Sequence, residues 1–260
     1  MTIGGVPGGA RSPDAPGWKH HPDRSIRVTT DLTRLRTLLD EGTPVNWVCT
    51  GDSITHGLIH TQGARNYVDH LHELIRGDMS RVQDVIIDTA ISGWRIVQLL
   101  EDFDRRVAAW HPHVVTLMIG TNDCSTAGVF PVIEPAEFAA SVTEFVARVR
   151  ALGAIPVLQT QPAIDVRNAP ERARIAEFAQ AIRDVAAAQD VILIDQFARF
   201  AELGQERPGG IPWGMMNDPF HPNAAGHAAL ALGVAEALGL GAGSESRVLT
   251  HLRDRMLIAR

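Results

Sequence analysis

The chain is organised around one stretch, WVCTGDSITHG at residues 47–57. Residues 45–50 form an apolar run typical of a buried β-strand, and Gly51, Asp52 and Ser53 then predict a turn. In an open α/β sheet, ligands bind outside the carboxyl ends of the strands. Ser53 is therefore expected at such an end with its hydroxyl in a crevice, although a serine in this setting can also simply cap the next helix.

Strand-like and helical segments alternate along the rest of the chain. Further apolar runs lie at residues 85–87, 114–119, 155–158 and 191–194. Helical spacing of apolar residues is found at 32–39, 66–75, 96–110, 135–152, 170–188 and 222–238. Because the strands are continuous apolar runs, they fit a parallel sheet covered on both faces. We therefore predict an α/β fold, a three-layer doubly wound sandwich with a five-stranded parallel sheet.

The domain organisation follows from composition. Residues 45–238 show no internal repeat and no shift in composition, so we predict one domain over residues 31–240. Residues 1–30 begin rich in Gly and Pro and are predicted to be a flexible or surface-draped extension. Residues 241–260 carry apolar side chains at helical spacing and are predicted to be a helical tail, packed on the body or on a second subunit of a homo-oligomer.

Charge and cysteine content exclude several classes of protein. The net charge is −6 with scattered Lys and Arg, which argues against a nucleic-acid partner. No segment approaches the ~18 consecutive apolar residues of a membrane span. The N-terminus lacks the apolar core of a signal peptide, so a cytoplasmic location is expected. The cysteines, Cys49 and Cys124, provide no disulfide scaffold, and Cys49 is expected to be a small buried apolar residue.

Residues suited to acyl transfer follow several of the predicted strands. Ser53, Gly93 and Asn122 should converge, because the carboxyl ends of neighbouring parallel strands share one edge of the sheet. A serine nucleophile also needs a base, a group that orients the base, and donors for the oxyanion. Asp218 and His221 can supply the first two, since a tight turn brings their side chains together. A chance Asp-x-x-His in a loop before a helix is the alternative.

Together these pieces resemble the SGNH hydrolases, also called the GDSL family of esterases and lipases. The matching blocks lie at residues 51–55, 91–93, 120–123 and 218–222, and the resemblance covers residues 45–238. It implies the flavodoxin-like fold of that family, with Ser53 as nucleophile, His221 as base and Asp218 as its orienter. The implied oxyanion donors are the Ser53 and Gly93 N–H groups and the Asn122 amide.

One block departs from the family pattern. Asp88 and Ala90 stand where the family often has Asn and Gly, so the hydrogen bonds that support this loop are in question. We expect Asp52 and Asp123 to accept hydrogen bonds from loop N–H groups rather than to act as catalytic acids. His227 is expected to make a structural hydrogen bond.

Several other residues are candidates for lining the pocket: His56, Trp94, Cys124 and Trp213. His56 is equally compatible with a solvated position, and Trp94 with core packing. No spacing of Cys, His and carboxylate residues fits a known metal site, so neither a metal nor another cofactor is expected.

The predicted function is a serine esterase that hydrolyses a carboxylic ester through an acyl-enzyme. The motifs are similar to those of small bacterial acyl-esterases and carbohydrate deacetylases, which favours a short acyl group such as acetyl on a sugar or small metabolite. The loops at residues 124–135 and 207–217 are expected to set the pocket. An acyltransferase with the same triad and a non-catalytic binding module on this fold are the alternatives.

Overall fold

The sheet has five parallel strands in the order β2-β1-β3-β4-β5. The computed structural model describes residues 28–241 and 246–259, so nearly all of the extension predicted for residues 1–30 lies outside the described residues. The strands are Asn46–Gly51 (β1), Val85–Asp88 (β2), Val114–Met118 (β3), Ile155–Gln159 (β4) and Ile192–Ile194 (β5). This arrangement confirms the predicted parallel sheet.

The central strands are apolar because helices cover both of their faces. Every residue of β3 and β4 is buried, and so is all of β1 except Asn46. Continuous burial explains why the sequence shows unbroken apolar runs instead of alternation. The register pairs Gly51 at the end of β1 with Met118 at the end of β3. The segments that follow these two strands therefore leave the sheet side by side.

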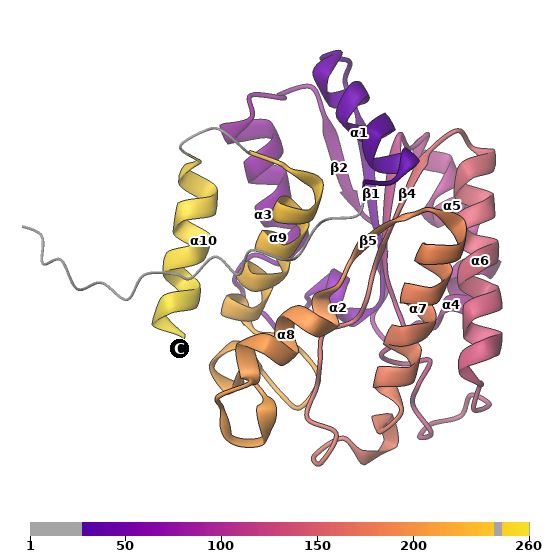
Figure 1. Ribbon diagram of the computed structural model, residues 1–260, viewed down its shortest axis with the longest axis vertical. Helices are drawn as coiled ribbons and strands as arrows, with labels where there is room; N and C mark the ends of the chain where they lie inside the picture. Colours follow the sequence, from indigo (N-terminus) through magenta and orange to yellow (C-terminus); the bar gives the residue numbers. More distant parts are fainter. Residues whose placement is uncertain (1–27, 242–245, 260) are drawn as a thin grey trace, which may run out of the picture.

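Helices form a layer on each face of the sheet (Figure 1). One layer contains Thr30–Asp40 (α1), Tyr67–Glu73 (α3), Gln196–Gly204 (α8) and Ala224–Leu238 (α9). The other contains Ile96–Glu101 (α4), Phe103–Arg106 (α5), Pro135–Ala151 (α6) and Ile175–Gln189 (α7). Each layer buries its own apolar cluster against the sheet, which confirms the predicted three-layer α/β sandwich.

Helix α9 is apolar on nearly all sides because other parts of the protein cover both its inner and its outer face. The sheet and its neighbouring helices cover one side, and α10 (Arg247–Ile258) packs on the other. A helix that is apolar all round is expected to be buried in this way. Asp78 fixes the start of α10, because its Oδ2 accepts the Ser246 hydroxyl at 2.6 Å and the Val248 N–H at 2.9 Å. The described part of the predicted 241–260 tail thus packs on the body.

Local structure differs from the sequence prediction in three places. The helix predicted for residues 170–188 begins only at Ile175, after a separate turn at residues 170–172. The helix predicted for residues 96–110 is interrupted at Asp102 (φ −102°, ψ 19°), whose carboxylate accepts N–H groups from Arg105 and Arg106. Helix α8 was not predicted. Single turns complete the structure at Leu74–Asp78 (η1), Ala108–Trp110 (η2), Pro170–Arg172 (η3), Pro208–Gly210 (η4) and Trp213–Met215 (η5). None of the helices in the described ranges combines the length and apolar character needed to cross a bilayer.

Candidate active site

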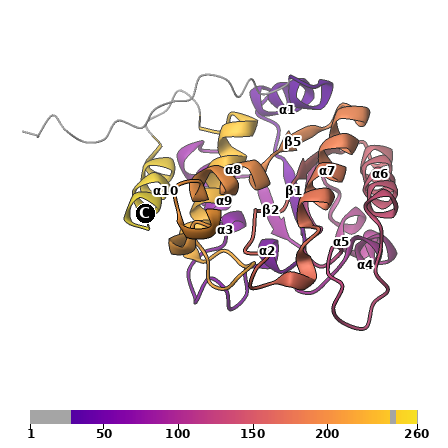
Figure 2. The same cartoon turned by 60° about the horizontal axis from the view of Figure 1, so that its bottom comes forward.

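Ser53 lies where β1 turns sharply into the short helix α2 (Ser53–His56), at the sheet edge that comes forward in Figure 2. The turn requires glycine at position 51, because a Cβ there would lie 1.9 Å from the Met118 carbonyl oxygen of β3. Asp52 caps α2, and its Oδ1 accepts the Ile54 N–H at 3.0 Å. The serine therefore begins a helix at the carboxyl end of a central strand, as predicted.

The structure brings the three predicted triad residues together. The Ser53 Oγ lies 2.8 Å from the His221 Nε2, and the His221 Nδ1 lies 2.7 Å from the Asp218 Oδ2. The other carboxylate oxygen, Oδ1, accepts the backbone N–H groups of Phe220 at 3.0 Å and His221 at 2.9 Å. Because an ionised carboxylate only accepts, Nδ1 carries the ring proton and Nε2 is left to accept from the serine.

The electrostatics of this pair suit a neutral base beside a charged carboxylate. Burial alone would raise the pKa of Asp218, but hydrogen bonds from the Phe220 N–H and from His221 outweigh it and hold this pKa below its ordinary value. Burial lowers the pKa of His221 below its ordinary value, against the hydrogen bond and charge of Asp218. At neutral pH the imidazole is therefore free to accept a proton.

The predicted oxyanion donors follow β1, β2 and β3 at the same sheet edge. Gly93 has φ +83°, and the space where a Cβ would point is open, so its backbone is accessible. Asn122 donates one amide hydrogen to the Trp94 carbonyl at 3.1 Å, which leaves the second for another acceptor. Within the described residues, no hydrogen bond uses the N–H of Ser53 or of Gly93. Each of these three groups therefore has a hydrogen that no hydrogen bond within the described residues uses, and their role as oxyanion donors stays a prediction.

Two carboxyls lie beneath these loops, both fully buried. The Oδ1 of Asp52 accepts the Ile54 N–H, and the Oδ1 of Asp123 accepts the Ile96 N–H at 2.9 Å. Burial raises the pKa of Asp52 to about 6 and, with the added charge of Asp52, that of Asp123 to about 7. Both accept from loop N–H groups, as the sequence predicted.

The turn that carries Gly93, one of the predicted oxyanion donors, is supported by hydrogen bonds despite its departure from the family pattern. The Asp88 Oδ1 accepts the Ala90 N–H at 2.9 Å, and its Oδ2 accepts the Asn66 amide at 3.2 Å. The His56 Nδ1 accepts the Ser92 N–H at 3.3 Å and lies 3.2 Å from the Ser92 hydroxyl. His56 thus braces this turn, and Asp88 supplies an acceptor in place of the family's Asn.

The other candidate pocket residues lie in different surroundings. Trp94 is half-buried and packs against the apolar cluster on the α4–α7 side. Cys124 is only 3% exposed and belongs to that cluster, so it does not line an open pocket. Trp213 is exposed on η5. Cys124 is therefore too buried to line an open pocket, and the roles of Trp94 and Trp213 as pocket walls stay predictions.

His60 is a site residue that the sequence analysis missed. Its ring stacks on the His221 ring with centroids 3.5 Å apart and planes 11° from parallel. Its Nδ1 lies 3.5 Å from the Asp218 Oδ2, the oxygen that also contacts the base. No matched block includes position 60, and only the path of the loop after α2 brings this ring to the triad.

In the described ranges, His60, Asp218 and His221 form a group whose potential metal-ligand atoms lie within 4.8 Å of one another. Imidazole binds a metal through a lone pair in the plane of its ring. The two ring planes are stacked and nearly parallel, so their lone pairs do not converge on one ion. Metal binding here would require one ring to rotate out of the stack, and it would remove His221 from Ser53.

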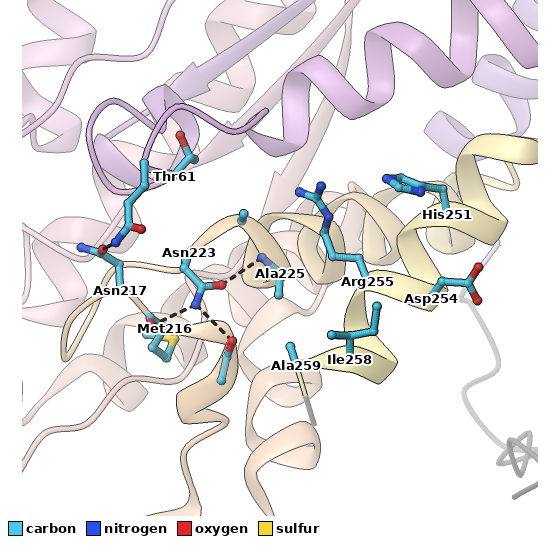
Figure 3. A pocket seen from close by; sticks show the side chains of 13 residues that line it. Thr61, Met216, Asn217, Asn223, Ala225, His251, Asp254, Arg255, Ile258 and Ala259 are labelled. Carbon is cyan, nitrogen blue, oxygen red and sulfur yellow. Dashed lines mark hydrogen bonds between the residues drawn. The ribbon is translucent and has the colours of Figure 1, made fainter.

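A cavity of about 590 Å³ lies between α10 and the loop that precedes Asp218 (Figure 3). Met216 and Asn217 line it from the loop, and Arg255 and Ile258 from α10. Gln62 also lines it and donates to the Asn217 Oδ1 at 2.9 Å. The cavity thus adjoins the loop of Asp218 and His221 from the side of α10, and neither Ser53 nor His221 lines it.

Comparison with known proteins gives a family match over most of the chain. A family model described as the GDSL-like lipase/acylhydrolase family matches residues 49–229. An uncharacterized protein of Mycoplasma pneumoniae is 33% identical over 97 residues, which are 36% of this chain and 11% of that relative. The chain therefore spans only a small part of the length of this curated relative.

Solved structures with the same fold cover most of the chain. An acetylxylan esterase from Geobacillus stearothermophilus has a TM-score of 0.65 and 22% identity, covering 79% of this chain and 99% of that chain. An α/β hydrolase enzyme from the metagenome of Lake Arreo, Spain, has a TM-score of 0.64 and 24% identity, covering 76% and 98%. The lipase/acylhydrolase from Enterococcus faecalis has a TM-score of 0.59 and 22% identity, and the match covers 75% of this chain and 96% of that chain. At these identities, the likeness shows a shared fold.

Proposed function

The chain belongs to the GDSL-like lipase/acylhydrolase family and is an ester-hydrolysing enzyme, and from this premise we propose that it works as a serine esterase through an acyl-enzyme. The observation that carries the proposal is the continuous contact from the Ser53 Oγ to the His221 Nε2 at 2.8 Å and from Nδ1 to the Asp218 Oδ2 at 2.7 Å. Nucleophile, base and orienter are thus in line.

In this mechanism, His221 takes the proton of Ser53 as its Oγ attacks the ester carbonyl. The N–H groups of Ser53 and Gly93 and the Asn122 amide stabilise the oxyanion. His221 then gives its proton to the leaving alcohol, and the acyl group stays on the serine. Water, deprotonated by the same imidazole, releases the acid and restores the enzyme.

We propose a short acyl group, such as acetyl on a sugar or small metabolite, as the substrate. The fold shared with an acetylxylan esterase supports this choice as the first class to test. A panel of chromogenic esters from acetyl to long acyl, run beside acetylated sugars, tests it. We expect the highest kcat/KM with acetyl, and a preference for long acyl chains would contradict the proposal.

The nucleophile is tested with Ser53→Ala and a fluorophosphonate probe. The wild type should be labelled, and the variant should lose labelling and nearly all esterase activity while its melting temperature stays close to that of the wild type. Activity should persist in EDTA, because no step uses a metal. Turnover near wild type in Ser53→Ala would show that another group is the nucleophile, and acyl transfer to an added alcohol would identify an acyltransferase.

A further inference from the structure

The ring of His60 is placed against the base in a way that the proposed mechanism does not require. It lies face to face with His221, with centroids 3.5 Å apart, and its side chain is only 15% exposed. Its Nδ1 also lies 3.5 Å from the Asp218 Oδ2. His60 therefore covers the base and the outer side of the hydrogen bond that orients it.

The loop that holds His60 is strained. Ile59, one residue before it, has a φ value of 56°, and Gln62, two residues after it, has a φ value of 53°. Residues other than glycine rarely adopt positive φ values, and a β-branched residue such as isoleucine does so least often. Ile59 is 82% exposed, so burial of its side chain does not offset this strain. Strain of this kind persists where other contacts fix the backbone. Here these contacts include the His60 stack, the hydrogen bond from Gln62 to Asn217 at 2.9 Å and backbone hydrogen bonds within the loop.

The two hydrogen bonds of His221 leave one motion unrestrained. Bonds at Nε2 and Nδ1 fix the line through the ring, but they allow the ring to tilt about that line. A second ring stacked at 3.5 Å blocks this tilt, because the tilted imidazole would collide with it. Such alignment matters for rate, since a misplacement of about 1 Å at a reacting group can cost about 10²-fold.

We propose that His60 is a positioning residue that holds the His221 imidazole in the plane in which Nε2 faces Ser53 and Nδ1 faces Asp218. This inference rests on the proposed serine mechanism. The flat ring of His60 positions the base by contact alone, and His60 transfers no proton. An aromatic ring without nitrogen should therefore replace it, and a small side chain should not.

The test compares His60→Ala, which removes the ring, with His60→Phe, which keeps a flat ring but no nitrogen. We expect kcat to fall about 10–100-fold in His60→Ala with KM changed less than about 3-fold, and to stay within about 5-fold of wild type in His60→Phe. His72→Ala, a histidine substitution on α3 away from the triad, is the matched control and should leave kcat unchanged.

Proton NMR gives a readout that loss of stability alone would not change. The low-field resonance of the His221 Nδ1 proton should persist in His60→Phe and broaden in His60→Ala. A wild-type kcat in His60→Ala, or an equal loss of kcat in both variants, would overturn the inference. In either case, labelling of the wild type that is abolished in Ser53→Ala would leave the serine mechanism standing, so the two failures are distinguishable.

Discussion

Asp218 contacts the His221 ring that reaches Ser53, and Asp52 directly precedes Ser53, yet their surroundings shift their pKa values in opposite directions. Asp218 accepts hydrogen bonds from two backbone N–H groups and from the His221 ring, and its pKa lies below its ordinary value. Asp52 is fully buried and accepts from the Ile54 N–H, and burial raises its pKa to about 6. Each carboxyl interacts with backbone and side-chain donors, so the comparison teaches that the depth of burial decides the direction in which each pKa moves.

The difference suits the two halves of the proposed reaction. On the base side, a charged Asp218 stabilises the imidazolium that forms when His221 takes a proton. On the oxyanion side, a fixed negative charge near Gly93 and Asn122 would oppose the charge that develops on the substrate oxygen. Burial raises the pKa of Asp52 to about 6 and that of Asp123 to about 7, so near neutral pH these two carboxyls carry less negative charge than exposed carboxyls would.

The largest effect should come from removing the charge on the base side. Asp218→Asn keeps the shape of the side chain but can donate to Nδ1 and so favour the wrong tautomer of His221. We expect kcat to fall by about 10³–10⁴-fold with the fold intact, measured with a short-acyl chromogenic ester. A loss smaller than about tenfold would show that Asp218 does not orient the base.

A smaller loss is expected when one oxyanion donor is removed. Asn122→Ala should lower kcat by about 10²–10³-fold, or roughly 2.7–4 kcal/mol, with a smaller change in KM. Because Asn122 also donates to the Trp94 carbonyl, the variant should lose about 1 kcal/mol of stability as well. A clear fall in melting temperature with kcat within a few-fold of wild type would assign Asn122 to the loop alone.

The pH profile reports the base side separately. Only neutral His221 can accept the serine proton, so kcat/KM should rise with pH and then level off. Burial lowers the pKa of His221 from 6.5, so the half-maximal point should lie below pH 6.5, with about a tenfold loss per pH unit below it. Initial rates from pH 4.5 to 8 measure this, and a flat profile would exclude a histidine base in this range.

Most of the fold was predictable because it depends on local patterns. The apolar run of β3 and the Gly-x-Asn-Asp that ends it predict Asn122 at the sheet edge, where the structure has it. The expected structural role of His227 is confirmed, since its Nδ1 accepts the Tyr67 N–H at 3.1 Å. The interruption at Asp102 was missed because it depends on side-chain contacts that periodicity does not encode. Helix α8 was missed although Phe197, Phe200 and Leu203 recur at helical spacing after the N-cap Asp195.

The candidate site also contains contacts that the sequence could predict and contacts that it could not. The contact between Asp218 and His221 follows from a three-residue spacing and a tight turn, so the sequence could predict it. The stacking of His60 could not be predicted, because it depends on the path of a loop that Gln62 ties to Asn217, 155 residues away. Likewise, the burial of Cys124 follows from how its loop packs on the helices below it.

The smallest effect on activity should come from Asp52→Asn, the same substitution made on the oxyanion side. Asparagine keeps the oxygen that caps α2, and its amide can donate to the Thr121 hydroxyl, which interacts with Asp52. We expect kcat within about threefold of wild type, because Asp52 supplies no charge that the reaction uses. If Asp52→Asn lost as much kcat as Asp218→Asn, the contrast between the two carboxyls would not hold.

The effect of this substitution should instead lie in how stability depends on pH. Folding raises the pKa of Asp52 from 3.8 to about 6, so between about pH 4 and 6 the folded state binds more protons than the unfolded state. Wild-type stability should therefore fall as pH rises through this window, by an amount on the order of 1–3 kcal/mol, and Asp52→Asn should not show that part of the fall.

Melting temperatures of both proteins at pH 4 and pH 8 measure the difference: relative to wild type, the variant should be more stable at pH 8 than at pH 4. Asp52→Ala is the control, because it also loses the cap and should be less stable than Asp52→Asn by about 1 kcal/mol at both pH values. A difference between wild type and Asp52→Asn that does not change with pH would show that Asp52 ionises as easily as an exposed carboxyl, and that burial does not set the two sides of the serine apart.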